Sequence, residues 1–310
     1  MSADGGFLAD VDQRARSVAL GVARITVGAM WLANLHWKVP PAFGEDTGGG
    51  LYKYSAAVLR HSTFAPFAWV TEELILPNFR LFGWLTLLAE MTVAVLLIAG
   101  RFTRLAALAG AALTVPILLT VLYYDRADEW SWSYLLMFAA HLLIYGSMAG
   151  DHLGVDGVVR GDARQCTRAT VWVGATATII GLAGLWVSRS TAFAGGRLVL
   201  LGSDAGFIDD GGALVRRWEL KFVWFNPLWA LVTVVAGLLA LASLRLPWAR
   251  LVAGMLGTAA GVITLAIGTF DYERSDQSIQ VVATASNAAL WFAFALSLLT
   301  FEWADRRTSP

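Results

Sequence analysis

The chain of 310 residues is 57% hydrophobic and only 15% charged. Soluble domains carry about 25% charged residues, so this composition excludes an ordinary soluble protein and indicates several membrane spans. The formal net charge is zero, which gives no reason to expect nucleic-acid binding, and the single cysteine, Cys166, excludes an internal disulfide.

Eight apolar runs are long enough to cross a bilayer, at about 20 residues for a hydrocarbon core about 30 Å thick. We therefore expect an all-α integral membrane protein with eight transmembrane helices. When the second half of the sequence is aligned with the first at a shift of 146 residues, Arg250 aligns with Arg104 and Asp271 with Asp125, which favours a parallel tandem repeat. The alternative is that unrelated helical hairpins look alike because all of them follow the same rule of positive charge on the cytoplasmic side. The runs cover about residues 15–36, 79–100, 103–123, 132–149, 169–188, 222–243, 248–270 and 279–300.

The predicted domain organisation is a tail at 1–14 and two four-helix units, at 15–160 and 161–310. The tail is short and polar, unlike a cleaved signal peptide. Basic residues mark the cytoplasmic ends of spans, so the pattern predicts a multi-pass protein of the plasma membrane with both termini in the cytoplasm. The arginines that alternate with acidic or mixed connections are Arg14, Arg16, Arg101, Arg104, Arg160, Arg164, Arg168, Arg245, Arg250, Arg306 and Arg307.

Two outer connections are long enough to carry structure of their own. In the first, LYKYSAAVLR is predicted to form a surface helix, and FAPFAWVTEELIL is too short to span and is predicted to lie in the interface with Trp69 as an anchor. In the second, at 189–221, GGRLVLLG and GGALVRRW flank a Gly/Asp turn and predict a β-hairpin.

Glu90 lies about halfway along the second predicted span. A carboxylate at that depth costs several kcal/mol unless it is paired, protonated or faces a polar cavity. Counting 1.5 Å per residue from the inner ends places Arg24 at a similar depth, so we expect these two side chains to pair. The fourth span brings His141 near the midplane with Tyr145 one turn deeper, and Thr114 falls near the same level.

The predicted catalytic residues are therefore Glu90, His141 and Arg24. A carboxylate and an imidazole that exchange protons suit quinone chemistry, because reduction of a quinone takes up two electrons and two protons. The residues expected to contact the quinone are Tyr145, Thr114 and Trp31. The alternative is a buried Arg24–Glu90 ion pair that only fixes helix packing.

The outer end of the first span carries a second polar group. His36, Lys38 and Arg80 are predicted to form a basic mouth that binds a small anionic substrate, the alternative being ordinary snorkelling at the interface. The four histidines fall at different depths, so we expect no haem and no metal.

The run Arg24–Gly28, with Lys38 past the helix end, resembles the R-x-x-x-G…K opening of the DoxX/DoxD membrane proteins. Glu90 with GRFTRLAAL at 100–108 resembles that family's second helix and inner turn, and AGDHLGVDG at 149–157 resembles the ending of its fourth, with Asp156 in the place of the family's aspartate. The resemblance covers about residues 15–160.

That resemblance implies a four-helix membrane bundle and, through DoxD, the membrane subunit of a thiosulfate:quinone oxidoreductase with a partner subunit. Arg24, Lys38 and Glu90 are the polar residues it carries over. The long first outer loop and the second four-helix unit depart from the family's pattern. The leading interpretation is quinone-linked oxidation of a small reduced sulfur compound. Two alternatives stay open: a non-catalytic scaffold that anchors a partner complex, and a transporter of small anions.

Overall fold

The structure is a computed structural model of the whole chain. It describes residues 3–35, 38–61, 64–122, 131–147, 149–151, 153–160, 163–188, 227–270 and 285–308, and four short strands between 196 and 225. The connections at 123–130 and 271–284, which carry the predicted acidic outer charges, lie outside these ranges, as do His36 and His152.

Each of the eight predicted spans corresponds to a helix. Six of these helices, among the described residues, are long and apolar enough to cross a membrane. They contain the segments Ala15–Leu35, Ala65–Ala99, Thr103–Val121, Gln165–Trp186, Pro247–Ala266 and Ala285–Arg307. The apolar parts of the other two are shorter, at Ser133–Gly146 and Trp229–Ala242, so the eight-span arrangement stays a prediction.

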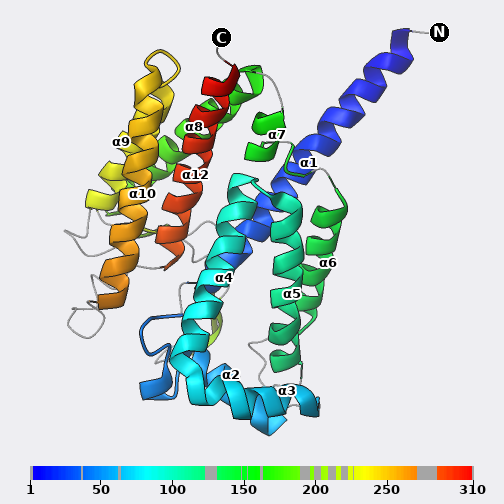
Figure 1. The fold of residues 1–310 in the computed structure, drawn as a ribbon, viewed down its shortest axis with the longest axis vertical. Helices are drawn as coiled ribbons and strands as arrows, with labels where there is room; N and C mark the ends of the chain where they lie inside the picture. The colour runs from blue at the N-terminus through cyan, green and yellow to red at the C-terminus, as the bar shows by residue number, and fades with distance from the viewer. Residues whose placement is uncertain are drawn as a thin grey trace.

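The first bundle contains four helices: α1 (Ala3–Leu35), α4 (Phe79–Ala99), α5 (Thr103–Val121) and α6 (Ser131–Gly146). Helix α1 packs against both α4 and α6, and α5 lies between α4 and α6 (Figure 1). Gly28 lets α1 approach α4 closely, because a Cβ there would lie 2.7 Å from Ile98 Cγ1. Large apolar side chains on the outer faces of these helices are exposed, as in a surface that meets lipid; they include Leu81, Leu85, Leu105, Leu136 and Leu143.

The remaining helices are α7 (Val155–Arg160), α8 (Ala163–Ser188), α9 (Pro227–Ala242), α10 (Pro247–Phe270) and α12 (Ala285–Thr308). Two close pairs form, α8 with α9 and α10 with α12. Helix α12 also packs against α1 and α4 of the first bundle, where the Ser286 hydroxyl donates to the carbonyl oxygen of Leu32 at 2.7 Å. The second group of helices is therefore joined to the first mainly through α12; whether it is a repeat of the first stays a prediction.

The first outer connection folds across one end of the bundle. LYKYSAAVLR forms α2 (Gly50–His61), as predicted. The next helical stretch runs through α3 (Ala65–Val70), a π-helical turn η2 (Thr71–Ile75) and a 3-10 turn η3 (Leu76–Asn78) into α4. The π-helical turn η2 precedes Pro77 and the 3-10 turn η3 contains it, and the chain changes direction there, so α3 lies crosswise to α4 (Figure 1). Trp69 is exposed there, in agreement with an interfacial position.

The second outer connection contains antiparallel strand pairs, as predicted, but the strands that pair are not the two predicted runs. Strand β2 (Asp204–Ile208) pairs with β3 (Leu214–Arg217), and β1 (Gly196–Leu198) pairs with β4 (Val223–Phe225), both antiparallel. The run GGRLVLLG therefore pairs with the segment just before α9, and the turn segment SDAGFIDD supplies a strand of its own.

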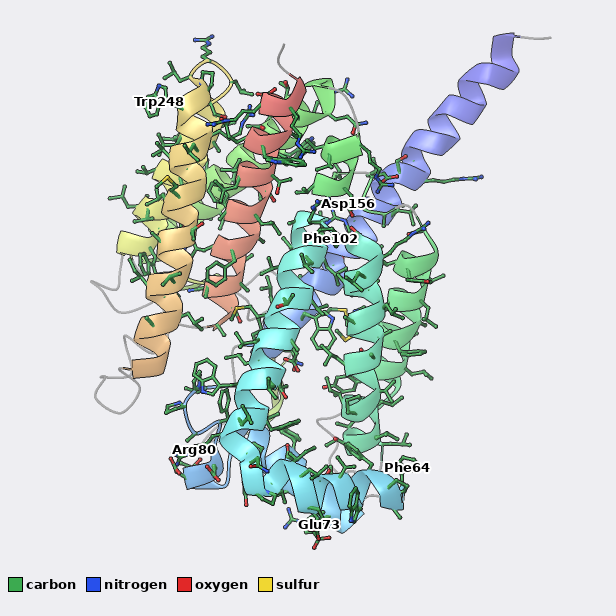
Figure 2. All side chains as sticks on the ribbon, in the orientation of Figure 1. Phe64, Glu73, Arg80, Phe102, Asp156 and Trp248 are labelled. Atoms are coloured by element: carbon green, nitrogen blue, oxygen red, sulfur yellow. The ribbon has the colours of Figure 1, made fainter. Side chains whose placement is uncertain are left out.

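The start of α1 and the end of α12 lie at the same end of the molecule, together with α7 and the α9–α10 turn (Figure 1). This end carries Arg160 of α7, Arg245 of the α9–α10 turn, and Arg306 and Arg307 of α12. In Figure 2, Phe102 and Asp156 lie near it. The labelled Phe64, Glu73 and Arg80 lie at the opposite end. The placement of both termini with the arginines agrees with the predicted topology; its assignment to the cytoplasm stays a prediction.

Candidate functional site

Glu90 forms an ion pair with Lys38. Glu90 Oε2 lies 2.7 Å from Lys38 Nζ, and both side chains are only 2% exposed. Removing a carboxylate and an ammonium from water costs several kcal/mol for each ion, which their attraction offsets only if both partners stay in place. The pair is therefore a charged element of the interior, and each residue depends on the other.

Lys38 lies just beyond the end of α1 and is held close to its last turn. The backbone N–H of Lys38 donates to the carbonyl oxygen of Leu35, the last residue of α1, at 3.2 Å. The ammonium group then donates to the carbonyl oxygen of Asn34 at 2.8 Å. The side chain consequently points back into the bundle, toward α4, instead of outward to solvent.

The pair lies in the wall of a cavity of about 170 Å³. The cavity is bounded by α2, η2, α4, α5 and α6, and most of its wall is aliphatic or aromatic. Hydroxyl groups and one amide are also present in the wall. The polar lining residues besides Lys38 and Glu90 are Asn34, Tyr54, Ser55, Thr71, Thr86, Thr120 and Tyr134. A mostly apolar cavity with a few convergent polar groups is the usual form of a small-molecule site.

The predicted pair between Arg24 and Glu90 is wrong. Arg24 is fully buried, but its guanidinium donates to backbone carbonyls: Nε to Ala149 at 3.2 Å, Nη1 to Leu97 and Ile98, and Nη2 to Leu153 at 2.8 Å. Leu97 and Ile98 lie about two turns beyond Glu90 on α4, a rise of about 11 Å. The predicted depth of Arg24 takes Arg14 and Arg16 as the inner end of the first helix. Helix α1 instead runs unbroken from Ala3, so these two arginines do not mark its inner end.

Arg24 instead belongs to a cluster that closes the inner end of the bundle. A cation is favourable at the carboxyl end of a helix, and Arg24 lies at that end of α4. Beside it, Asp156 accepts hydrogen bonds from the backbone N–H groups of Phe102 and Thr103, each at 3.0 Å, and from Arg101 at 3.2 Å. The motifs GRFTR and GDHLGVD are thereby fastened to one another. Their role in this geometry is to hold α4, α5 and α7 together.

His141 lies apart from the cavity and is occupied at both ring nitrogens. Nδ1 lies 2.7 Å from the carbonyl oxygen of Met137, and Trp31 Nε1 donates to Nε2 at 2.9 Å. A carbonyl oxygen only accepts, so Nδ1 carries the hydrogen and Nε2 accepts from the indole. Gly110 makes room for the ring, because a Cβ at that position would collide with Nε2. This geometry favours a packing role over the predicted proton transfer.

The structure does not bring the other predicted site residues together. Thr114 is buried and donates to the carbonyl oxygen of Gly110 at 2.8 Å, while Tyr145 is 45% exposed on the outer face of α6. Arg80 is exposed and pairs with Glu45 and Asp46, at 2.9 and 3.3 Å. The predicted basic mouth is therefore not formed by its two described members, Lys38 and Arg80; His36, the third, lies outside the described residues.

Sequence reasoning missed the two tyrosines of the cavity wall, Tyr54 and Tyr134. Tyr54 belongs to α2, which was interpreted as a surface helix; the helical pattern of LYKYSAAVLR contained a usable signal, since Leu51, Tyr54, Ser55 and Val58 share one face. Tyr134 follows a loop whose length alone does not fix its position.

Comparison with known proteins agrees with these motifs. Residues 20–186 match the family described as TQO small subunit DoxD. The matched region runs from within α1 to near the end of α8, and it contains Arg24, Lys38, Glu90 and Asp156. No curated protein and no solved structure matches the chain. The match covers just over half of the 310 residues, so the chain belongs to the DoxD family.

Proposed function

We propose that the protein is the membrane component of a quinone-linked oxidoreductase and that the quinone ring binds in the cavity beside Lys38 and Glu90. The observation that carries this proposal is the buried ion pair in the wall of that cavity. A pair that served helix packing alone would gain nothing from an adjoining space. The family supports the quinone, since its name designates a subunit of a TQO complex.

The cavity fits the ring of a quinone in size and chemistry. An apolar cavity of about 150 Å³ in another protein accommodates benzene, so a space of about 170 Å³ suits one six-membered ring. The aliphatic wall matches the ring faces. Lys38 and the tyrosine hydroxyls are hydrogen-bond donors of the kind that carbonyl oxygens accept from.

A quinone supplies the capacity to accept two electrons together with two protons. The chain's own contribution is to hold the protons. Glu90 Oε2 and Lys38 Nζ are 2.7 Å apart, so a proton at this site is shared between a carboxylate and an amine shielded from water. Lys38 Nζ also stays fixed by the Asn34 carbonyl oxygen, which orients its remaining N–H groups. Leu113, Pro116 and Ile117 exclude water from the opposite wall.

The finer proposal names thiosulfate, or a small sulfur compound like it, as the electron donor. Oxidation of two thiosulfate ions to one tetrathionate forms an S–S bond and releases the two electrons that reduce the quinone. Nothing in the cavity wall selects this donor, and it comes from the family alone. The donor is expected to be handled with a partner subunit, as the term small subunit implies.

The test is the rate of quinone reduction in lipid nanodiscs by the protein purified together with its partner subunit, with thiosulfate as donor and a short-chain quinone as acceptor. Glu90→Gln keeps the shape of the side chain but removes the shared proton. We expect the rate to fall at least about tenfold, the lower end of a general acid–base contribution. Glu73→Gln, the same change at an exposed position at the outer end, should leave the rate unchanged.

Binding of the quinone is measured in parallel by quenching of tryptophan fluorescence. If the parent binds quinone and Glu90→Gln reduces it at the parental rate, the proton role is refuted. If the parent binds no quinone, the site assignment is refuted, and a scaffold that anchors a partner becomes the better interpretation. Uptake of a sulfur oxyanion into proteoliposomes without quinone reduction would favour a transporter.

A further inference from the structure

A second cavity, of about 290 Å³, lies at the junction between the family-matched helices and the C-terminal helices. Helices α1, α4 and α8 contribute one part of its wall, and α9 and α12 contribute the rest. The α9 and α12 residues lie outside the family match. This cavity is therefore a property of this chain's own architecture and is separate from the Lys38–Glu90 site, with which it shares no lining residue.

Among the residues that the structure describes, the wall of this second cavity carries no charged side chain. Three tryptophans, Trp172, Trp229 and Trp291, form much of its surface. Two of its hydroxyl groups are satisfied by their own helices: Thr233 donates to the carbonyl oxygen of Trp229 at 2.7 Å, and Ser297 to that of Ala293 at 2.8 Å. Such a wall favours a hydrocarbon over any polar or charged ligand.

The lining of the cavity extends far along one helix and includes exposed side chains. Its lining residues on α12 extend from Asn287 to Ser297, which is about 15 Å along the helix axis. Trp172 and Ile25, which line it from α8 and α1, are 62% and 39% exposed. Both lie within segments long and apolar enough to cross a membrane, and exposed residues of such segments meet the hydrocarbon core of a bilayer.

We propose that this cavity binds one acyl chain of an anionic phospholipid from the leaflet on the arginine side. The charge near the inner end of α8 selects the head group. Arg168 is exposed and lies one turn before Trp172 on the same face of α8, in line with the stripe that continues to Thr176 and Ile180. An arginine at a membrane surface attracts an anionic head group, and the chain below it enters the cavity. The bound lipid fills the space between α8, α12 and the first bundle.

The experiment is lipid analysis by mass spectrometry of the full chain, delipidated and then reconstituted with equal amounts of phosphatidylglycerol and phosphatidylcholine. The parent should retain one phosphatidylglycerol per chain. Arg168→Gln should reduce its retention about fivefold. Arg245→Gln, the same change at another exposed arginine of the same end, should leave it unchanged. Ala177→Phe fills the cavity and should abolish retention of either lipid, while Ala112→Phe on the exposed face of α5 should not.

Three results would overturn the proposal. Equal retention by the parent and Ala177→Phe would show that no chain enters the cavity. Equal preference for the two lipids, unaffected by Arg168→Gln, would refute the selection by charge. Retention of an added isoprenoid quinone in place of phospholipid would assign the cavity to the quinone. Arg168→Gln changes only an exposed side chain, so the test holds even if Ala177→Phe fails to fold. None of these outcomes depends on quinone reduction.

Discussion

The residues that determine the candidate site act in pairs. Glu90 forms an ion pair with Lys38, and His141 accepts a hydrogen bond from Trp31. All four side chains are buried. In a membrane interior a polar group is stabilised by a specific partner, because no water replaces that partner when it is lost. Substitution of one member should therefore cost more than substitution of both.

For the ion pair, Lys38→Met should lower the free energy of unfolding by about 3–5 kcal/mol, because it leaves a buried carboxylate without its partner. The double variant Lys38→Met/Glu90→Leu should recover most of that loss. Thermal unfolding in detergent, followed by circular dichroism, measures both. Arg80→Gln breaks an exposed pair that solvent already screens and should change the transition far less. A double variant no more stable than Lys38→Met would contradict the coupling.

For the second pair, Trp31→Phe removes the indole N–H that His141 Nε2 accepts from. The expected loss is about 1–3 kcal/mol of unfolding free energy, the cost of one buried acceptor left unsatisfied. The rate constant for quinone reduction should stay within about twofold of the parent, since neither side chain lines the cavity. A tenfold drop in that rate at unchanged stability would restore His141 to the proton pathway.

The sequence predicts the buried polar residues of this site but not which of them pair. The depth of Glu90 predicts a counter-ion, and Lys38 is a cation near the end of α1. The Lys38 side chain lies inside the bundle against Glu90, and no periodicity in the sequence indicates whether a lysine past a helix end points inward or outward. Arg24 was assigned to Glu90 because both lay at the same counted depth, a measure that fails when a helix extends beyond the membrane.

At the scale of the helices, close packing depends on small residues. Gly174 and Gly181 on α8 face Gly237 and Ala230 on α9, and a Cβ at Gly237 would lie 2.6 Å from the backbone nitrogen of Thr178. Between membrane helices, where water provides no hydrophobic driving force, such close backbone approach is a main source of association. The helix ends are fixed by other means, with Gly100 in the left-handed region at the end of α4 and Asp156 at the start of α5.

Gly237→Ala tests this packing. The added methyl meets Thr178 Oγ1 and also the backbone of Thr178 and Gly174, which a side-chain rotation cannot relieve, so α8 and α9 must separate, at a cost of about 1–3 kcal/mol. Gly146→Ala is the matched control, because a Cβ there meets nothing within 4 Å. The control should be neutral or slightly stabilising, since alanine is favoured over glycine in a helix. Equal thermal transitions for the two variants would show that the α8–α9 approach contributes little.

For the molecule as a whole, the main result is two groups of helices joined mainly through α12, with one cavity inside the first group and a second at the junction between the two. The helices themselves were predictable from apolar length, and the placement of both termini at one end agrees with the charge pattern (Figure 1). The packing of α12 against α1 and α4 could not be predicted, because nothing in an apolar run identifies which distant helix it contacts. The hairpin was predicted by its glycines and aspartates, but its strand partners were not.

The topology is tested with reporter fusions. Fluorescent protein fused after Pro310 or before Met1 should fluoresce, and alkaline phosphatase at either position should be inactive, if both ends are cytoplasmic. Alkaline phosphatase inserted within residues 199–203, between β1 and β2, should be active, because this connection is predicted to lie on the opposite side. Activity at one terminus only would exclude an even number of spans.

The contact between Ser286 and Leu32 also sets the order of assembly during biosynthesis. These two residues are 254 positions apart. At about 5–20 residues per second, a ribosome needs roughly 10–50 s to deliver the second after the first. Throughout that interval the sides of α1 and α4 that α12 finally covers remain open to the translocon or to lipid. A nascent chain released before Ala285 would keep them uncovered and present them to quality-control proteases.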